Sequence, residues 1–255
     1  MLRFAIGSGK GGVGKSTVAL NLALALRDLG RKVALFDADF YGPNLALMTG
    51  IARLKPADYL TVAARSRQRL KPMRRYGLAI QSAGFVLAED QPNVLEAGAI
   101  EMFARTLLEA TDWGDSDLML VDLPPGTADI QQILMRIIPF TAAIVVVTPQ
   151  DVAHLDARKA VQMYRKHNVE VVGAIENMSG LRCPHCGERI DVFPPVSHER
   201  SIWSLKVDKL GEVPLDPALG AAGDAGVPLL EREPESAAAR AFRDAAANLV
   251  SRAAR

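Results

Sequence analysis

The sequence has little that would take it out of the cytosol. It contains two cysteines in 255 residues, and because they lie close together they do not make a disulfide framework. Its apolar runs are too short to cross a bilayer, and no basic, apolar and small-residue pattern opens the chain. A formal net charge of +1 gives no general attraction to nucleic acid or membrane. We therefore expect a cytoplasmic globular protein that does not bind a membrane.

Residues 9–17 carry the most informative motif of the chain. They fit the pattern G-x-x-x-x-G-K-[ST], with Gly9, Gly14, Lys15 and Ser16 at its fixed positions. Glycines let the backbone curl so that its N–H groups face phosphate oxygens. A lysine at this place binds the β- and γ-phosphates, and the serine hydroxyl is a Mg²⁺ ligand. We therefore predict that ATP and Mg²⁺ are bound by the residues Gly9, Lys10, Gly11, Gly12, Val13, Gly14, Lys15, Ser16 and Thr17.

A second pattern overlaps the first. Residues 7–12 also fit G-x-G-x-x-G, the fingerprint of dinucleotide binding, for which Asp37 and Asp39 would be ribose ligands. That pattern leaves the Gly-Lys-Ser at 14–16 unexplained. We therefore favour the phosphate-binding loop.

Strand and helix patterns alternate along the chain. The apolar runs lack a polar alternation, as expected of strands buried on both faces. The expected strands are 3–7, 33–37, 78–82, 118–122, 142–148, 169–176 and 212–214, and the expected helices are 17–29, 92–110, 128–138, 153–167, 216–225 and 234–254. This order predicts an α/β fold with a doubly wound, mostly parallel sheet of the P-loop NTPase type. We expect one domain over 1–255, with a basic insertion near 53–76 and a C-x-x-C loop near 177–198.

Carboxylates follow two of these strands. Asp122 ends an apolar strand and is placed to hold Mg²⁺ directly or through water. Asp39 is the better candidate for positioning the attacking water, whereas Asp37 suits capping or a turn. Phosphoryl transfer is mostly positioning and charge compensation, so Lys10, Lys15 and Asp39 are the predicted catalytic group. Gly126 follows two prolines, and its bare N–H is expected to contact a γ-phosphate.

The two cysteines form the second informative motif. Cys183 and Cys186 stand on a Pro/Gly loop, where both thiolates can bind one metal. Soft-metal sites and [4Fe–4S] clusters usually take four ligands, which a two-fold dimer would supply. A zinc site that recruits His185 or His198, a redox-active pair and a chance pair are the alternatives. An iron–sulfur cluster shared between two subunits is the interpretation we favour.

Lys10 places a second lysine near the start of the phosphate loop. The resulting Lys-Gly-Gly-x-Gly-Lys resembles the deviant Walker A loop of partition proteins, MinD and the nitrogenase iron protein. In that class the extra lysine reaches the nucleotide of the other subunit. The resemblance therefore implies a homodimer with ATP at its interface.

The whole chain resembles the Mrp/ApbC family of iron–sulfur cluster carrier ATPases. The resemblance implies a homodimer that binds and slowly hydrolyses ATP, holds a [4Fe–4S] cluster at paired Cys183 and Cys186, and delivers it to apo iron–sulfur proteins. It also implies that Asn177 and Pro214 contact the adenine base. The segments that match the family are 7–17, 37–44, 112–114, 121–127, 147–152, 155–158, 175–179, 183–187 and 213–217.

Two segments depart from the family pattern. Residues 192–198 replace a glycine-rich stretch after the cysteines, which alters the loop beside the predicted cluster. Residues 53–75 hold eight basic residues and one acidic one, a pattern that also occurs in partition ATPases that bind DNA through phosphate contacts. No base-reading motif accompanies it, so we do not expect nucleic acid as a partner.

A MinD-like switch with zinc or no metal at the cysteines is the alternative function. The last helix has a thin apolar face and is expected to pack on the domain rather than on a membrane.

Overall fold

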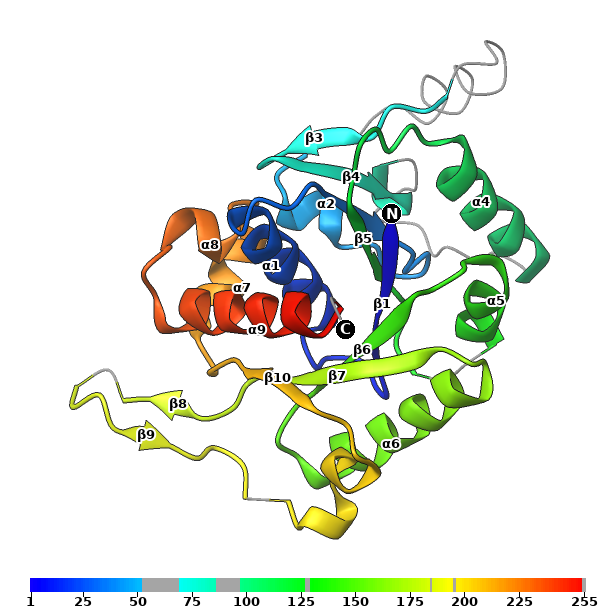
Figure 1. Ribbon diagram of the computed structural model, residues 1–255. Helices are drawn as coiled ribbons and strands as arrows, with labels where there is room; N and C mark the ends of the chain where they lie inside the picture. The colour runs from blue at the N-terminus through cyan, green and yellow to red at the C-terminus, as the bar shows by residue number, and fades with distance from the viewer. Residues whose placement is uncertain (52–68, 86–96, 127–128, 184, 195, 254–255) are drawn as a thin grey trace.

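The computed structural model describes residues 1–51, 69–85, 97–126, 129–183, 185–194 and 196–253. Its strands are β1 (Leu2–Ser8), β2 (Val33–Asp37), β3 (Met73–Arg75), β4 (Leu78–Ser82), β5 (Leu118–Asp122), β6 (Ala142–Val147), β7 (Glu170–Glu176), β8 (Leu181–Arg182), β9 (Arg189–Ile190) and β10 (Lys209–Glu212). Eight of them form one sheet in the order β10-β7-β6-β1-β5-β2-β4-β3 (Figure 1). Every neighbouring pair is parallel except β3 with β4. The predicted doubly wound, mostly parallel sheet is confirmed.

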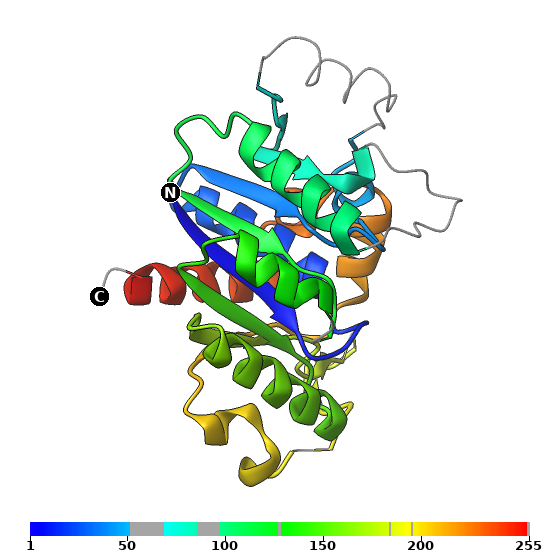
Figure 2. The same ribbon diagram turned by 90° about the vertical axis from the view of Figure 1, so that its right-hand side faces the viewer.

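Helices cover both faces of this sheet (Figure 2). They are α1 (Lys15–Asp28), α2 (Leu45–Met48), α4 (Ala97–Ala110), α5 (Asp129–Ile137), α6 (Asp151–Lys166), α7 (Pro217–Asp224), α8 (Leu229–Arg232) and α9 (Ala237–Ala253), with 3₁₀ turns η1 (Ala83–Phe85), η2 (His198–Arg200) and η3 (Ile202–Leu205). One apolar core packs α1, α7, α8 and α9 against the sheet, and a second packs α4, α5 and α6 against the opposite face. The strands are therefore buried on both faces, as their unalternating apolar sequences predict.

The strand order places a crevice at the end of β1. This strand lies between β6 and β5. The chain leaves β1 toward β2 on one side and leaves β6 toward β7 on the other. The boundary between β1 and β6 is therefore a topological switch point, where ligands bind in such sheets. The register pairs Asp122 with Ile6 of β1 and with Asp37 of β2. Two acidic strand ends therefore lie side by side next to the loop that follows β1.

The expected strand 212–214 is wrong in its position. The observed strand β10 is Lys209–Glu212, and Pro214 lies beyond it. Proline has no N–H to donate to a sheet ladder, and Leu210 is the side chain that this strand buries. The part of the expected helix that covers 92–96 lies outside the described residues.

The end of the basic insertion belongs to the sheet. Met73–Arg75 is an antiparallel edge strand that pairs with β4. Tyr76 and Gly77 join the two strands with φ angles of 50° and 72°, which suit a tight hairpin turn. The side chains of Arg74 and Arg75 are exposed, as charged side chains on an edge strand often are. Residues 53–68 lie outside the described residues, so the role of the basic segment stays a prediction.

The last helix packs on the domain, as predicted. In α9, Phe242 and Leu249 are buried in the core shared with α1. Among the described residues, no helix combines the length and apolar character that a membrane crossing requires.

The side chain of Tyr164 in α6 packs against Gly7, near the end of β1. Its hydroxyl is buried without a hydrogen-bond partner among the described residues, and it fills the space that Gly7 leaves, where a Cβ would stand 1.8 Å from it. Burial raises the pKa of Tyr164. Because an unpaired buried hydroxyl is unfavourable, Tyr164→Phe is expected to leave stability unchanged or raise it by up to about 1 kcal/mol. Urea unfolding measures this, and a clear loss of stability would contradict it. Gly7→Ala, which inserts the clashing Cβ, is the destabilising control.

Candidate functional site

The phosphate loop joins β1 to α1 and is held by close backbone contacts. A Cβ on Gly9 would stand 2.1 Å from the carbonyl carbon of Asp156 in α6. Gly14 has a left-handed φ of 81°, and a Cβ there would stand 2.3 Å from Nδ2 of Asn177. Neither position accepts a side chain. The helix begins at Lys15, two residues before the predicted start, because Val18 N donates to Gly14 O at 2.9 Å and so closes the first helical turn.

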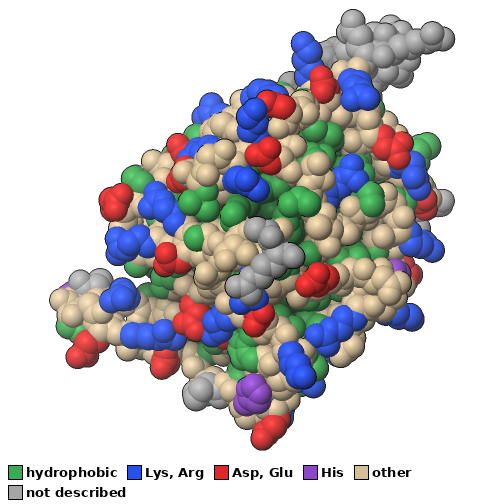
Figure 3. All heavy atoms as spheres, viewed as in Figure 1, with side chains coloured by type: hydrophobic (Ala, Val, Ile, Leu, Met, Phe, Trp, Pro, Cys, Tyr) green, Lys and Arg blue, Asp and Glu red, His purple; other side chains and the backbone are tan. Residues whose placement is uncertain are grey.

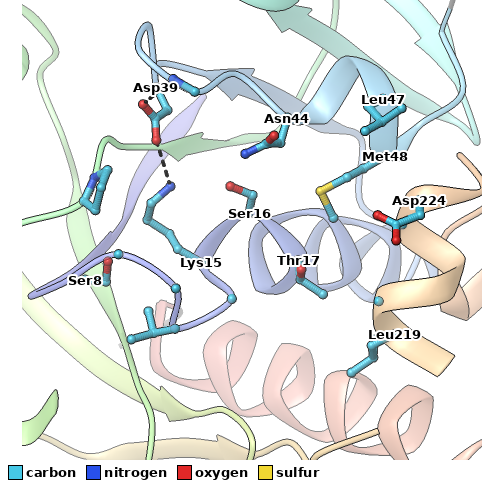
Figure 4. A pocket seen from close by; sticks show the side chains of 18 of the residues that line it. Ser8, Lys15, Ser16, Thr17, Asp39, Asn44, Leu47, Met48, Leu219 and Asp224 are labelled. Atoms are coloured by element: carbon cyan, nitrogen blue, oxygen red, sulfur yellow. Dashed lines mark hydrogen bonds and ion pairs between the residues drawn. The ribbon is translucent and has the colours of Figure 1, made fainter. Parts of the chain in front are cut away.

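Lys15 is buried between carboxylates. Its Nζ lies 2.6 Å from Oδ1 of Asp122. The same atom lies 3.9 Å from Oδ2 of Asp39 (Figure 4). Burial alone would lower the pKa of Lys15, but the ion pair with Asp122 and the neighbouring Asp39 and Asp37 raise it above the usual value. The lysine therefore stays charged at the place where the motif requires a cation for phosphate.

The remaining oxygen of Asp122 fits a magnesium ion. Its Oδ2 is buried and has no hydrogen-bond partner among the described residues, although such oxygens in folded proteins are nearly always paired. Ser16 lines the cavity over the loop, next to Lys15 in the first turn of α1. Hard oxygen donors of this kind suit Mg²⁺, either directly or through bound water. The structure is therefore compatible with Ser16 and Asp122 as the Mg²⁺ ligands.

Asp37 and Asp39 differ in what they contact. Asp37 is fully buried and accepts hydrogen bonds from Ser82 Oγ at 2.8 Å and from Leu45 N at 3.2 Å. Burial and the nearby Asp122 raise the pKa of Asp37 to about 7. It therefore orders the turn before α2, as predicted. Asp39 lines the pocket, and burial raises its pKa as well.

A cavity of about 420 Å³ opens over the loop. Figure 4 shows Lys15, Ser16 and Thr17 at one end and α2 and α7 at the other. The residues at the α2 and α7 end of the cavity were not predicted, because these two helices lie far apart in the chain. Gly220 and Gly223 leave room between these helices, and a glycine pair in α7 is the one local signal that could have indicated this wall. The cavity residues that were not predicted, in these helices and in other nearby segments, are Ser8, Gly42, Asn44, Leu47, Met48, Pro125, Leu219, Gly220, Gly223 and Asp224.

Three residues that were predicted to contact the nucleotide have other neighbours in this structure. Asn177 supports the loop from behind, because its Nδ2 donates to the carbonyl of Val13 at 2.8 Å. Pro214 lines a different cavity at the base of the cysteine loop. The N–H of Gly126 is not bare, since it donates to the carbonyl of Ser8 at 3.1 Å. The expectation of a free N–H at Gly126 is wrong for this conformation, and the adenine contacts stay predictions.

Lys10 also has a partner within its own chain. Its Nζ donates to Oε1 of Gln150 at 2.9 Å, at the start of α6. The same side chain lines the rim of the cavity. The lysine is therefore next to the phosphate site, and its reach into a second subunit stays a prediction.

The cysteines lie at the tip of a projecting hairpin. Strands β8 and β9 pair Leu181 with Ile190, and the turn is closed by bonds from Cys183 N to Glu188 O at 2.8 Å and from Gly187 N to Cys183 O at 2.9 Å. The hairpin extends from the sheet edge (Figure 1) and carries basic and acidic side chains along its length (Figure 3). Cys183 is half-buried and Cys186 is exposed. Backbone N–H groups of Cys186 and His185 lower the pKa of Cys183.

A metal site within one chain finds no support in the described residues. They contain no group of three or more His, Cys, Asp or Glu side chains that could hold a metal ion. His185 is exposed in the cysteine turn, whereas His198 is exposed in η2 at the far end of the following segment. Two thiols from each of two chains would meet the usual demand for four ligands.

The sequence matches a known protein family whose description agrees with this geometry. The sequence model of a ParA-type family, described as NUBPL iron-transfer P-loop NTPase, matches residues 2–250. The chain belongs to this family. The membership agrees with the assembled loop, Lys15 and Asp122, and it sets aside the dinucleotide-binding interpretation of residues 7–12. It also confirms the resemblance on which the family-based predictions rest.

Relatives of the family carry names that bear on function. An iron–sulfur cluster carrier protein of Aquifex aeolicus is 43% identical over 241 residues, which are 93% of this chain and 64% of that protein. The iron–sulfur cluster transfer protein NUBPL of Mus musculus is 38% identical over 252 residues, 97% of this chain and 76% of that protein. The chain thus spans somewhat under two thirds of the Aquifex relative.

A solved structure of the same fold contains nucleotide. The nucleotide-binding protein of Archaeoglobus fulgidus in complex with ADP is 32% identical, has a TM-score of 0.74, and the match covers 92% of this chain and 89% of that one. The cell-division ATPase MinD of Pyrococcus furiosus matches with a TM-score of 0.72 at 24% identity and 98% coverage of both chains. This second likeness shows the fold alone. The family to which the chain belongs is one of P-loop NTPases.

Proposed function

We propose that this protein is an ATP-dependent iron–sulfur cluster carrier. Two copies hold one [4Fe–4S] cluster at paired Cys183 and Cys186 and deliver it to apo iron–sulfur proteins. The observation that carries the proposal is the presence of both devices in one chain: a complete phosphate loop and an exposed two-thiol turn on a projecting hairpin. The names of the Aquifex and mouse relatives support the same cargo.

The thiol turn is suited to binding iron. Hydrogen bonds from backbone N–H groups lower the pKa of Cys183, and the thiolate is the form that binds metal. The exposed position of Cys186 leaves room for a second hairpin, and two copies bring four thiolates to one site. The cluster would then be near the surface, where a recipient protein can reach it.

The nucleotide site would act through positioning and charge. Gly9–Thr17 would cradle the phosphates with Lys15 as the buried cation, and Ser16 and Asp122 would hold Mg²⁺, which supplies charge compensation when bound. Asp39 would orient the attacking water, and Lys10 would serve the nucleotide of the partner subunit. Gly126 must leave the carbonyl of Ser8 before it can contact a γ-phosphate. That rearrangement is a reason to expect slow hydrolysis.

Iron and acid-labile sulfide content tests the proposal directly. After anaerobic reconstitution, the parent protein should hold about two irons and two sulfides per chain, in a particle with the mass of a dimer. His185→Ala is the matched control, since it removes the other side chain of the turn with metal-binding chemistry and should retain the iron. Zinc without sulfide, or a protein that stays metal-free, would contradict the proposal. A metal-free ATPase would favour the MinD-like switch instead.

A further inference from the structure

The cysteine hairpin is joined to the rest of the molecule by a short segment, residues 179–182, which we call its root. Its strands pair over two residues each, and a hairpin this short is not stable alone. At the root, Ser179 N donates to Val213 O and Leu215 N donates to Gly180 O, both at 2.8 Å. The position of the cysteines therefore depends on how residues 179–182 sit against the segment after β10.

The side chain of Arg189 makes several contacts around this root. Arg189 of β9 donates from Nε to Asp191 Oδ1 at 2.9 Å and from Nη2 to Ser179 Oγ at 3.4 Å, and its Nη1 lies 3.6 Å from Glu212 Oε2 of β10. The guanidinium also lies against Gly180, where an added Cβ would stand 2.8 Å from Nε. Arg189 therefore connects the hairpin, its root and the edge strand of the main sheet.

The same root is tied to the phosphate loop. Glu212 forms an ion pair with Lys209, whose Nζ lies 2.7 Å from Oε2 of Glu176. The next residue, Asn177, holds the carbonyl of Val13 in the phosphate loop. The stretch from residue 176 to residue 180 thus contacts the nucleotide loop at one end and Arg189 at the other.

The root also has strain and free space. Met178 has a left-handed φ of 58°, which is unfavourable for a residue with a side chain, and Gly180 follows with a φ of 75°. Cavities of about 220 Å³ and about 190 Å³ flank this corner, and Ser179, Gly180 and Arg189 line both of them. A tightly packed core resists displacement, whereas this corner has room on two sides.

We propose that Arg189 is a positioning residue that couples the phosphate loop to the cysteine turn. The proposal rests on the proposed function, in which those cysteines hold the cluster. When nucleotide fills the loop, Val13 and Gly14 shift against Asn177, the strained corner at Met178 moves with it, and Arg189 exchanges its contacts at Ser179 and Glu212. The hairpin then changes its angle to the sheet, which alters the exposure of Cys183 and Cys186.

Alkylation of the thiols in the metal-free full chain measures this coupling. With iodoacetamide, Mg-ATP should change the alkylation rate of the cysteine pair about fivefold relative to the nucleotide-free protein. Arg189→Ala should bring that ratio close to one while the affinity for a fluorescent ATP analogue stays at the parent value. Arg189→Lys, which keeps the charge but loses the planar fork, should restore part of the ratio. A purely structural role would change both rates equally and leave the ratio intact.

Arg182→Ala is the matched control. Arg182 is the cross-strand neighbour of Arg189, and its one described hydrogen bond stays within the hairpin, to Gly187 O at 3.4 Å, so its removal should preserve the parent ratio. The proposal is overturned if the parent shows no effect of nucleotide, or if Arg189→Ala keeps the parent ratio. Because the assay contains no iron, its result is independent of the iron and sulfide measurement that decides the proposed function.

Discussion

Replacing Cys183 by alanine is expected to abolish iron and sulfide binding after anaerobic reconstitution. Each chain would then contribute one thiolate, so a dimer would offer two where the cluster takes four. The described residues also contain no group of three or more His, Cys, Asp or Glu side chains that could hold a metal ion in its place. The loss should be complete rather than partial, and Cys186→Ala should give the same result.

The nucleotide site of this variant should be intact. Cys183 lies on the projecting hairpin and does not line the cavity over the phosphate loop. Affinity for ATP should therefore equal that of the parent, which also shows that the variant is folded. Iron retained at the parent level by Cys183→Ala would mean that the cluster, if there is one, is held elsewhere. Loss of ATP binding together with iron would mean that the two sites are not separable.

The sequence predicts the positions of the phosphate loop and of Asp122 because these parts are local. The phosphate loop is one contiguous motif, and Asp122 ends a strand whose apolar sequence identifies it. Both places follow from the rule that ligands bind at the carboxyl ends of parallel strands. Asp37 could be assigned to a turn for the same reason, because it is the last residue of a buried strand.

The parts that sequence reasoning missed depend on contacts between distant segments. The far wall of the cavity is built by Leu47 in α2 and Asp224 in α7, two short helices that pack directly against each other on one face of the sheet. The hydrogen bond from Gly126 N to Ser8 O joins the loop after β5 to the end of β1 and has no sequence signal. Arg189 was one charge among many in a polar stretch, and its role at the hairpin root becomes visible only when Ser179, Gly180 and Glu212 are placed around it.

Lys15→Ala is expected to reduce ATP hydrolysis by about 10²–10³-fold, because it removes the buried cation that compensates phosphate charge. The change also leaves Asp122 buried without its ion-pair partner at 2.6 Å, which should destabilise the nucleotide-free protein by about 3 kcal/mol. Phosphate release and urea unfolding in EDTA measure the two effects. Lys159→Ala is the control, since Lys159 is largely exposed and its ion pair, with Asp156, lies on the surface of α6.

The double variant Lys15→Ala/Asp122→Asn separates these two consequences. Neutralising Asp122 removes the unpaired buried charge, so much of the lost stability should return, and a double-mutant cycle measures the coupling of the two residues. Hydrolysis should not return, because the phosphates still lack their cation. In the proposed mechanism, Lys15→Ala should still take up iron at the hairpin but transfer it at a rate that ATP no longer changes. If ATP altered that transfer as in the parent, nucleotide and cluster would be uncoupled in this protein. If the double variant stayed as unstable as the single one, Lys15 would support the loop by packing rather than by charge.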